Sequence, residues 1–345
     1  MKLLLCSVPF SPSVGGIETV SALLVEQFVA AGHAVTVLTQ TPGPPSNGPY
    51  ALVRRPTLRR LWALVADCDA VVHNQISLRL AWPLLFLTRP WVIAHHNWLD
   101  AHGANWLLVA IKRMALRGAQ NIAVSRAIAD ALPLPARVVP NPYANSVFAP
   151  LPGVQRQREL LFVGRLVSDK GTDLLLAALA LLQPQGLRPR LSIVGDGPQA
   201  AALMTQAQQL GLGEQVLFMG ALQGAALARV FHAHRLLVVP SVWAEPFGLV
   251  ALEALACGCM PLVARCGGLV DAAGPGAASF EAGNVQDLAR CLASALVIPA
   301  RPVQPGANAQ AHLARHSPAR VAQTYLDVIA DARRGHRLAA SVGGA

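Results

Sequence analysis

Short apolar segments of strand length alternate with helical patterns along almost the whole 345-residue chain. This alternation restricts the fold more than any other feature, because strands separated by helices favour parallel sheets that are covered by helices on both faces. In the first half, strands are expected over 2–9, 34–40, 70–73, 91–95, 121–125 and 137–139, and a helix over 16–31. The sequence therefore predicts an α/β fold with doubly wound, Rossmann-like sheets.

A proline-rich segment interrupts this alternation and predicts a domain boundary. Pro140-Asn141-Pro142 and the run PLPG at 150–153 are followed by polar residues, which is typical of a linker. A second series then follows, with strands over 159–163, 190–194, 215–219, 236–239 and 260–264 and helices over 172–182, 199–210 and 224–232. Two such domains would hold a ligand in a crevice at the carboxyl ends of their strands.

The expected domain limits follow from this boundary. We expect an N-terminal domain over 1–150 and a C-terminal domain over 151–316. The helix expected over 317–334 would cross back to the first domain, and 335–345 would form a loose tail.

Charge and composition limit the functional classes. The net charge is +10, and basic residues lie beside apolar ones in two places, at Arg54 to Arg60 near Trp62 and around Lys112, Arg113 and Arg117. Such stretches suit either peripheral contact with an anionic membrane or a solvated protein face. No nucleic-acid-binding motif accompanies them, so nucleic acid is not an expected partner. The sequence assigns no oligomeric state.

Targeting and metal signals are weak in this chain. No uninterrupted apolar run is long enough for a transmembrane helix, and the N-terminal segment is too short for a convincing secretory signal. The six cysteines lack the paired spacing of a zinc site. We expect reduced cysteines in a cytoplasmic protein with no metal site.

One carboxylate, Glu253, stands inside an otherwise apolar helical run over 249–257. A helix that is apolar on every face is expected to be buried, and a buried carboxylate is costly unless it is hydrogen-bonded, paired or protonated. Two explanations remain open: a structural pair with a core arginine, or a polar ligand. The preceding Glu245-Pro246-Phe247-Gly248 favours the ligand, because a glycine before a helix N-terminus allows close approach to an anion.

Three further segments follow predicted strands, where such sheets bind ligands. Gly15 and Gly16 permit close backbone approach to phosphate, although no G-x-G-x-x-G pattern is present. Arg165 and Lys170 place two cations after the first strand of the second series, where they could clamp a diphosphate in place of a metal. The turn Gly195-Asp196-Gly197-Pro198 is expected at the rim of the same crevice.

In this order, the four motifs resemble those of retaining glycosyltransferases with the GT-B fold, of the family-four (group 1) type. The motifs are Gly15-Gly16-Ile17-Glu18, Gly164-Arg165 with Lys170-Gly171, Gly195-Asp196-Gly197-Pro198, and the Glu245-x7-Glu253 segment. The resemblance spans roughly residues 1–330. It implies metal-independent transfer of a hexose from a nucleotide diphosphate sugar, such as a UDP- or GDP-hexose, to a glycan, lipid-linked or cell-envelope acceptor. No other cofactor is implied.

The resemblance also implies a role for each matching residue. Gly16, next to Gly15, would approach the donor phosphates, and Arg165 and Lys170 would neutralise them. Glu245 would hold hydroxyls of the donor sugar, and Glu253 the ribose hydroxyls. Backbone amides near Phe247, Gly248 and Leu249 would contact sugar and phosphate.

A histidine after a strand of the N-terminal domain contacts the donor sugar in this family. The candidates here are His95 and His96, and His96 is favoured by its position before a polar residue. Pro142 departs from the family pattern, in which a glycine is common.

Two competing interpretations are considered. Asp67-Cys68-Asp69 matches the D-x-D metal motif of the other glycosyltransferase fold, but its position before a strand favours a helix exit and strand entry. The alternative functions are a GT-B sugar-nucleotide epimerase or phosphorylase, and a non-catalytic sugar-nucleotide-binding module.

Overall fold

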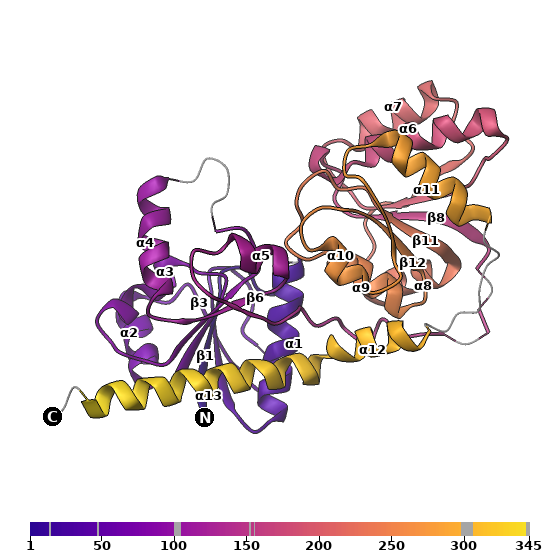
Figure 1. Cartoon of the computed structure of the whole chain (residues 1–345). Helices are drawn as coiled ribbons and strands as arrows, with labels where there is room; N and C mark the ends of the chain where they lie inside the picture. The colour runs from indigo at the N-terminus through magenta and orange to yellow at the C-terminus, as the bar shows by residue number, and fades with distance from the viewer. Residues whose placement is uncertain are drawn as a thin grey trace. The chain divides into compact units, whose positions relative to one another are not determined.

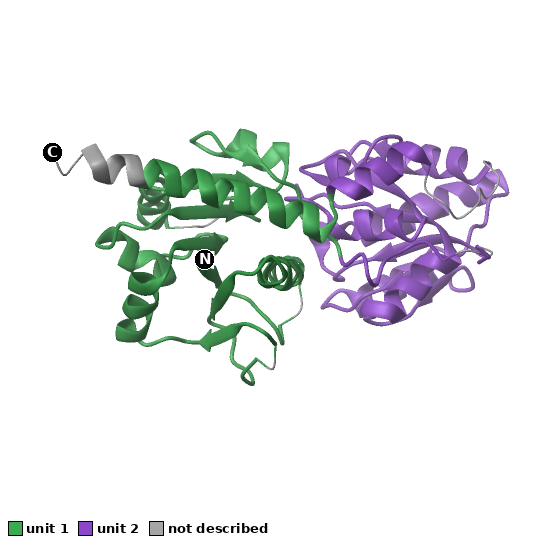
Figure 2. Ribbon diagram, turned by 90° about the horizontal axis from the view of Figure 1, so that it is seen from below, with its two compact units in different colours: residues 1–143, 316–345 green, residues 144–315 purple. Residues whose placement is uncertain are grey.

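The computed structural model describes residues 1–13, 15–46, 48–99, 105–151, 153–154, 156–297 and 306–342, with side chains as far as 336. The chain forms two compact units, one of Met1–Tyr143 with His316–Ala345 and one of Ala144–Arg315 (Figure 2). The sequence placed the boundaries near 150 and 316, so the first junction lies several residues earlier than expected. No helix of the described residues is long and apolar enough to span a membrane.

Unit 1 is built on a seven-stranded parallel sheet in the order β3-β2-β1-β4-β5-β6-β7 (Figure 1). Its strands are β1 (Lys2–Ser7), β2 (Ala34–Thr39), β3 (Ala51–Arg54), β4 (Ala70–Asn74), β5 (Trp91–His95), β6 (Gln120–Ala123) and β7 (Arg137–Val138). Its helices are α1 (Gly16–Ala30), α2 (Leu58–Asp67), α3 (Leu78–Ala81), the 3₁₀ turn η1 (Trp82–Leu85), α4 (Trp106–Leu116), α5 (Arg126–Ala131) and α13 (Pro318–Val342). The strand order reverses between β1 and β4.

Two hydrophobic clusters cover the two faces of this sheet. Residues of α1 and α13 pack on one face, with Phe28 of α1 near Tyr325 of α13. Residues of α2, α3, η1 and the end of α4 pack on the other face. The alternation of side chains along each strand supplies both clusters, since neighbouring strand residues point to opposite faces.

Three details of unit 1 differ from the expectations. Residues 335 to 342 continue α13 instead of forming a loose tail. The edge strand β3 was missed, because it is short, only half-buried and ends in arginine. Arg54, expected within an exposed basic cluster, donates hydrogen bonds to the carbonyl oxygens of Ser11, Thr41 and Pro44.

Unit 2 contains a six-stranded parallel sheet in the order β10-β9-β8-β11-β12-β13. Its strands are β8 (Arg158–Val163), β9 (Leu191–Val194), β10 (Val216–Phe218), β11 (His234–Val239), β12 (Met260–Ala264) and β13 (Ala278–Phe280). Its helices are η2 (Ser168–Lys170), α6 (Thr172–Leu182), η3 (Gln183–Gln185), α7 (Ala200–Gln209), α8 (Gly224–Ala233), α9 (Leu249–Ala256), α10 (Leu269–Ala273), α11 (Val285–Val297) and α12 (Ala307–Arg315). The order reverses between β8 and β11. The edge strand β13 was not expected.

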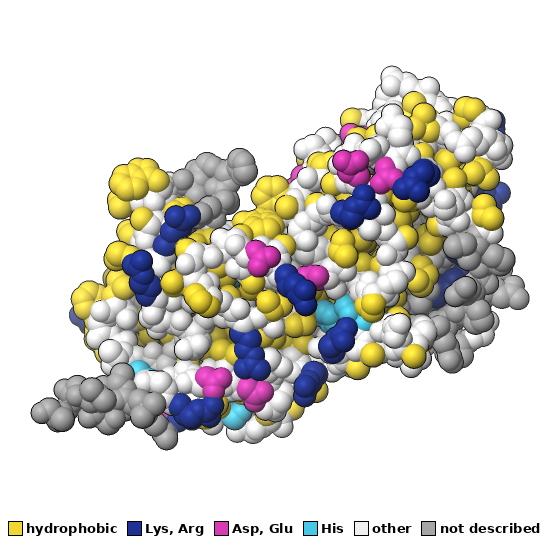
Figure 3. Space-filling view, viewed as in Figure 1, with side chains coloured by type: hydrophobic (Ala, Val, Ile, Leu, Met, Phe, Trp, Pro, Cys, Tyr) yellow, Lys and Arg dark blue, Asp and Glu magenta, His cyan; other side chains and the backbone are white. Residues whose placement is uncertain are grey.

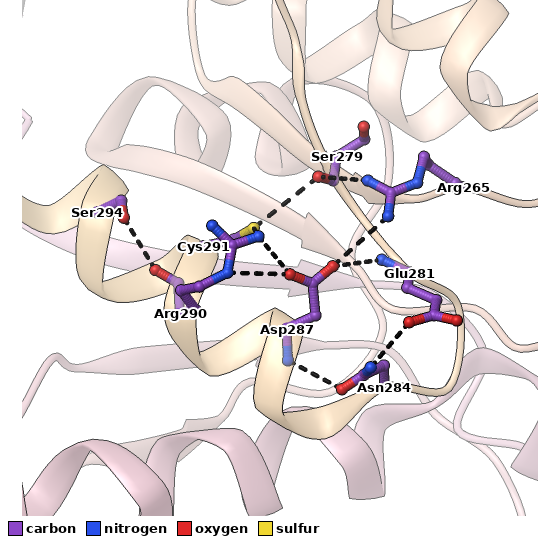
Figure 4. Close-up of polar contacts among 8 residues, drawn as sticks. All are labelled: Arg265, Ser279, Glu281, Asn284, Asp287, Arg290, Cys291 and Ser294. Atoms are coloured by element: carbon purple, nitrogen blue, oxygen red, sulfur yellow. Dashed lines mark hydrogen bonds and ion pairs between the residues drawn. The ribbon is translucent and has the colours of Figure 1, made fainter.

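A polar network fastens this edge strand to α11 (Figure 4). Asp287, in the first turn of α11, accepts a hydrogen bond from the backbone N–H of Glu281 at 2.8 Å and pairs with Arg265 at 3.6 Å. The side chain of Asn284 accepts the N–H of Asp287 at 2.9 Å. These contacts satisfy backbone donors at the helix start. They stabilise the sheet edge and include none of the candidate site residues.

Candidate active site

The candidate residues of unit 2 lie on segments that follow the carboxyl ends of adjacent strands. Arg165 and Lys170 come after β8, Asp196 after β9 and Glu245 after β11. β8 and β11 are neighbours at the point where the strand order reverses, which is where open α/β sheets bind ligands. The sheet topology therefore brings together segments that are 75 residues apart in sequence, measured from Lys170 to Glu245.

Lys170 and Glu245 form an ion pair at this switch point. Their side chains are 25% and 15% exposed, and the hydroxyl of Ser241 donates a second hydrogen bond to Glu245 Oε1 at 2.8 Å. Glu245 Oε2 makes no hydrogen bond with a described residue, so it can accept one from a ligand. The sequence predicted both residues but not their contact.

Arg165 is exposed, and no hydrogen bond or ion pair holds its guanidinium among the described residues. This cation, in the same segment after β8 as Lys170, is therefore available for an anionic ligand. Its loop is held close to the next one, since Leu166 N–H donates to Asp196 O at 2.9 Å. A Cβ on Gly197 would lie 2.4 Å from Leu166 O, so glycine is required there for packing of the two loops.

Two other loops fix the backbone around Glu245. The carbonyl oxygen of Asp169 accepts the N–H groups of Val242 and Trp243 at 3.0 and 3.2 Å. The Gly268 N–H donates to Glu245 O at 2.7 Å. Gly267 has a φ of +56°, and a Cβ there would lie 2.1 Å from Glu245 O. The loop after β12 therefore positions Glu245, a role that the Gly267-Gly268 pair could have signalled but that was not predicted.

Gly248 begins helix α9 with a φ of 107° and gives it no side-chain cap. A Cβ on Gly248 would lie 2.5 Å from the side chain of Leu269, so both backbone conformation and packing require glycine. Phe247 is buried, whereas Leu249 is half-buried. In the first turn of α9 the Ala251 N–H donates to Gly248 O at 3.0 Å, whereas the amides of Leu249 and Val250 precede any helical acceptor and can face an anion.

Glu253 lies on α9, whose other residues from Ala251 to Ala256 are buried. Burial alone raises the pKa of Glu253 to about 8, so the carboxyl is largely protonated at neutral pH. No hydrogen bond or ion pair reaches it from the described part of the chain. The described residues thus include no arginine partner for Glu253, whose side chain is itself half-buried. Because Glu245 lies in a loop before α9, the two glutamates do not share a helix.

The candidate residues of unit 1 also follow strand ends. Gly15 and Gly16 follow β1 and begin α1, which has no side-chain cap. A Cβ on Gly16 would meet no atom within 4 Å, so packing within the described chain does not explain this glycine. Gly15 has an extended backbone with a φ of 177°, which other residues also adopt. Open space at Gly16 permits a ligand to approach.

His95 and His96 differ in their partners. His95 ends β5, and its Nε2 contacts Asn121 Oδ1 at 3.1 Å. His96 is buried, and neither ring nitrogen has a hydrogen-bond partner in the described residues. Burial, followed by the charge of His95, lowers the pKa of His96 to about 3, so its ring is neutral. His95 Nδ1 also has no partner among the described residues, so the contacts of the two rings do not choose between the two candidates.

Gln75 was not predicted as part of the site. It follows β4 with a φ of 71°, and its Oε1 accepts the N–H groups of His96 at 2.9 Å and Asn97 at 3.1 Å. Its own N–H donates to Ala94 O at 2.8 Å. Its position after a strand was the one available signal.

Asp67-Cys68-Asp69 is a helix exit and strand entry. Asp67 ends α2 and pairs with Lys2 at 2.9 Å, and Asp69 lies 3.8 Å from Arg333 before β4 begins. Each aspartate has a cationic neighbour, which identifies a structural ion network at the amino ends of these strands.

Comparisons with known proteins agree with this arrangement. Residues 14–143 match the model of Glycosyltransferase Family 4, and residues 148–312 match that of Glycosyl transferases group 1. The chain belongs to the family-four type of glycosyltransferases. These two matches cover both units, as the order of the motifs in the sequence predicted.

Individual proteins of known name resemble this chain in sequence or in structure. The D-inositol 3-phosphate glycosyltransferase of Gordonia bronchialis is 38% identical over 47% of this chain and 38% of its own length. Sucrose-phosphate synthase from Thermosynechococcus elongatus has a TM-score of 0.78 at 22% identity, covering 96% of this chain and 99% of its own. Anabaena HepE, solved with UDP and glucose, has a TM-score of 0.74 at 23% identity over 96% and 99%. These likenesses show the GT-B fold. The chain spans less than half the length of the known relatives it matches by sequence.

Proposed function

We propose that the protein is a retaining hexosyltransferase that uses a nucleotide diphosphate sugar. The observation that carries this proposal is the Lys170–Glu245 ion pair at the switch point of unit 2, where the segment that bears Lys170 also bears the exposed Arg165. Two cations suit a diphosphate, and a carboxylate beside them suits a sugar hydroxyl. The partnerless Glu253 supports a hydroxyl-rich ligand, because sugar or ribose hydroxyls would supply the hydrogen bonds that the protein does not.

The proposed reaction uses the donor's own leaving group as the base. The bond between the anomeric carbon and the diphosphate oxygen breaks, while Arg165 and Lys170 stabilise the charge that develops on that oxygen. The acceptor oxygen bonds to the anomeric carbon on the same face, and its proton passes to the departing phosphate oxygen. Configuration is retained, and no strong protein base is needed. Metal independence is part of the proposal, because the cations supply the charge that a metal would otherwise provide.

A uridine donor is the first candidate, because the fold neighbour from Anabaena was solved with UDP-glucose. Thermal-shift measurements with UDP-, GDP- and ADP-hexoses would identify the donor. Release of the nucleoside diphosphate with EDTA present, and an α-anomeric product by NMR from an α-linked donor, are expected. A β-anomeric product contradicts retention. Turnover that EDTA abolishes and manganese restores contradicts metal independence.

The same assay distinguishes the alternative activities. Conversion of the donor into its epimer without an acceptor would identify an epimerase. Consumption of inorganic phosphate would identify a phosphorylase. Donor binding without any turnover in the presence of a broad acceptor panel would identify a binding module.

The proposed acceptor is a lipid-linked or cell-envelope glycan, and the proposed compartment is the cytoplasm. The cysteines support the compartment, since all six are free thiols. Radiolabelled sugar should enter the solvent-extractable fraction when membranes are supplied as acceptor. Label that remains on soluble glycans alone would contradict the lipid-linked assignment.

A further inference from the structure

Helix α4 exposes an unusual amount of apolar surface for a helix of this composition. Of its eleven residues, WLLVAIKRMAL, only Leu116 is buried. Trp106 is 78% exposed and Met114 64%, and Leu107 and Leu108 are also exposed. A helix that is apolar over most of its length normally lies in a core. Only the end of α4, at Leu116, packs on the core of unit 1, so an external apolar phase is the expected partner for the rest of its apolar surface.

Other elements that pack on the same face of the sheet also expose apolar side chains. α2, α3, η1 and the end of α4 contribute to one hydrophobic cluster on the sheet face. On their outer side, Trp62 of α2 lies 5.8 Å from Trp82 and 6.3 Å from Phe86, measured between ring centroids. Phe86 and Leu85 are mostly exposed. We define the amphipathic surface as Leu58, Trp62, Leu85, Phe86, Trp106, Leu107, Leu108 and Met114 together with the cations named next.

Charge on these elements is strongly one-sided. Their basic residues are Arg59, Arg60, Arg79, Lys112 and Arg113, with Arg117 at the end of α4. Their one acidic residue in the described helices is Asp67, which pairs with Lys2. Figure 3 shows Lys and Arg side chains among the hydrophobic ones on the α4 side of unit 1. This combination attracts an anionic surface that also has an apolar interior.

The order of residues along α4 indicates how such a surface would be engaged. Residues 106–111 are wholly apolar and extend about 9 Å along the axis. Lys112 and Arg113 follow directly. Amphipathic elements bury their apolar part about 5 to 10 Å into the boundary between headgroups and acyl chains, which would place these cations near the lipid phosphates.

We propose that the amphipathic surface docks unit 1 on an anionic lipid bilayer. Trp106 and its apolar neighbours enter the interface, and Lys112, Arg113, Arg59 and Arg60 contact anionic headgroups. Arg54 takes no part, because its guanidinium is held by loop carbonyls. The proposal is independent of the transfer reaction, since vesicle binding is measured without donor or acceptor.

Sedimentation of the full-length protein with vesicles tests the proposal. Vesicles of phosphatidylcholine with phosphatidylglycerol should bind the protein, and added salt should weaken binding. Lys112→Gln with Arg113→Gln should weaken it about tenfold or more. Trp106→Ser with Leu107→Ser should do at least as much. Matched control variants in unit 2 are Arg188→Gln with Arg229→Gln, and Met204→Ser with Leu217→Ser, all exposed residues whose replacement should leave binding unchanged.

Tryptophan emission supplies a second readout. Binding to vesicles should shift the emission to shorter wavelength, and Trp106→Phe should remove most of that shift while keeping vesicle affinity within a few-fold. Equal binding to neutral and anionic vesicles, or equal losses in the surface and control variants, would overturn the proposal. Absence of vesicle binding by the folded wild-type protein would overturn it as well, and would favour a protein partner for this surface.

Discussion

The side-chain oxygen of Gln75 accepts the backbone N–H of His96 at 2.9 Å, from a residue whose own φ is 71°. A non-glycine residue with this backbone conformation carries strain that surrounding contacts must offset. Here the contacts are the two N–H groups of His96 and Asn97 and the carbonyl of Ala94. Gln75 is therefore a positioning residue for the histidine whose ring nitrogens have no partner.

Replacing Gln75 should affect turnover through His96. Gln75→Ala leaves two backbone N–H groups without their acceptor, and we expect kcat to fall about tenfold while the donor KM changes less. Gln75→Glu keeps an acceptor oxygen and should recover most of the loss. Gln75→Gly relieves the backbone strain but still leaves the two N–H groups without an acceptor, so its kcat should fall as in Gln75→Ala. Arg55→Ala, at another residue with positive φ, is the control. Equal kinetic defects in the alanine and glutamate variants would show that the hydrogen bonds do not matter.

Donor affinity should depend on pH through Glu253. Its pKa of about 8 in the unliganded protein means that a ligand which hydrogen-bonds the carboxylate must release a proton at pH 7. Donor affinity should therefore rise with pH up to about 8 and then level off. Calorimetry in buffers of different ionisation enthalpy would measure the released proton. Glu253→Gln should raise the donor KM and remove the proton release. A proton release that persists in the glutamine variant would assign it to another group.

The same shift predicts a pH dependence of stability. The folded pKa of Glu253 is raised above its ordinary value of 4.5, so the folded protein retains a proton that the unfolded chain loses between pH 4.5 and 8. The contribution is complete below about pH 4.5 and is lost as pH rises through 8, by up to about 1.4 kcal/mol per pH unit. Denaturant unfolding of wild type and Glu253→Gln at several pH values would measure this contribution. Parallel pH profiles for the two proteins would contradict it.

The Lys170–Glu245 pair should show measurable coupling. Both side chains are partly buried, and Ser241 fixes the carboxylate, so a double-mutant cycle of Lys170→Ala and Glu245→Gln should give a coupling of about 1 to 3 kcal/mol in transition-state stabilisation. Glu245→Gln alone should chiefly lower kcat.

Lys170→Ala or Arg165→Ala should weaken nucleoside diphosphate binding by about 1.5 to 3 kcal/mol. Unchanged affinity in both cation variants would move the phosphate site elsewhere.

Arg156 should matter for the stability of unit 2. Its guanidinium donates hydrogen bonds to the carbonyl oxygens of Phe231 at 3.1 Å, His234 at 2.5 Å and Cys257 at 2.7 Å. Arg156→Met should lower the free energy of unfolding by about 2 to 3 kcal/mol, since three carbonyls lose a charged donor. Arg188→Met, at an exposed position, is the control and should change it by less than about 0.5 kcal/mol. Similar values for the two variants would show that these contacts contribute little.

The sequence alone determined the fold class and the type of many long elements, although no ranges were predicted for helices α2, α4 and α11. Helix 172–182 and strand 260–264 have the limits that were expected, because an apolar run of strand or helix length must be buried wherever it lies. The order of the motifs along the sequence also indicated the family. The candidate residues could be named as a set before any contact was known: Gly16, Arg165, Lys170, Glu245 and Glu253. Strands β3 and β13 were missed because they are short edge strands, whose apolar signal is weak.

Only the tertiary structure decided which of these residues meet. The contact of Lys170 with Glu245 depends on β8 and β11 being neighbours in the sheet, an order that the alternation of strands and helices does not specify. Glu253 was recognised from sequence as a carboxylate in an apolar helix, but only the structure shows that no described arginine pairs with it. Gln75 gave no signal beyond its position after a strand, because its importance lies in a backbone conformation and in two amides some twenty residues away. Periodicity records burial, which is a local property, whereas hydrogen-bond partners and pKa shifts depend on what the rest of the fold brings near.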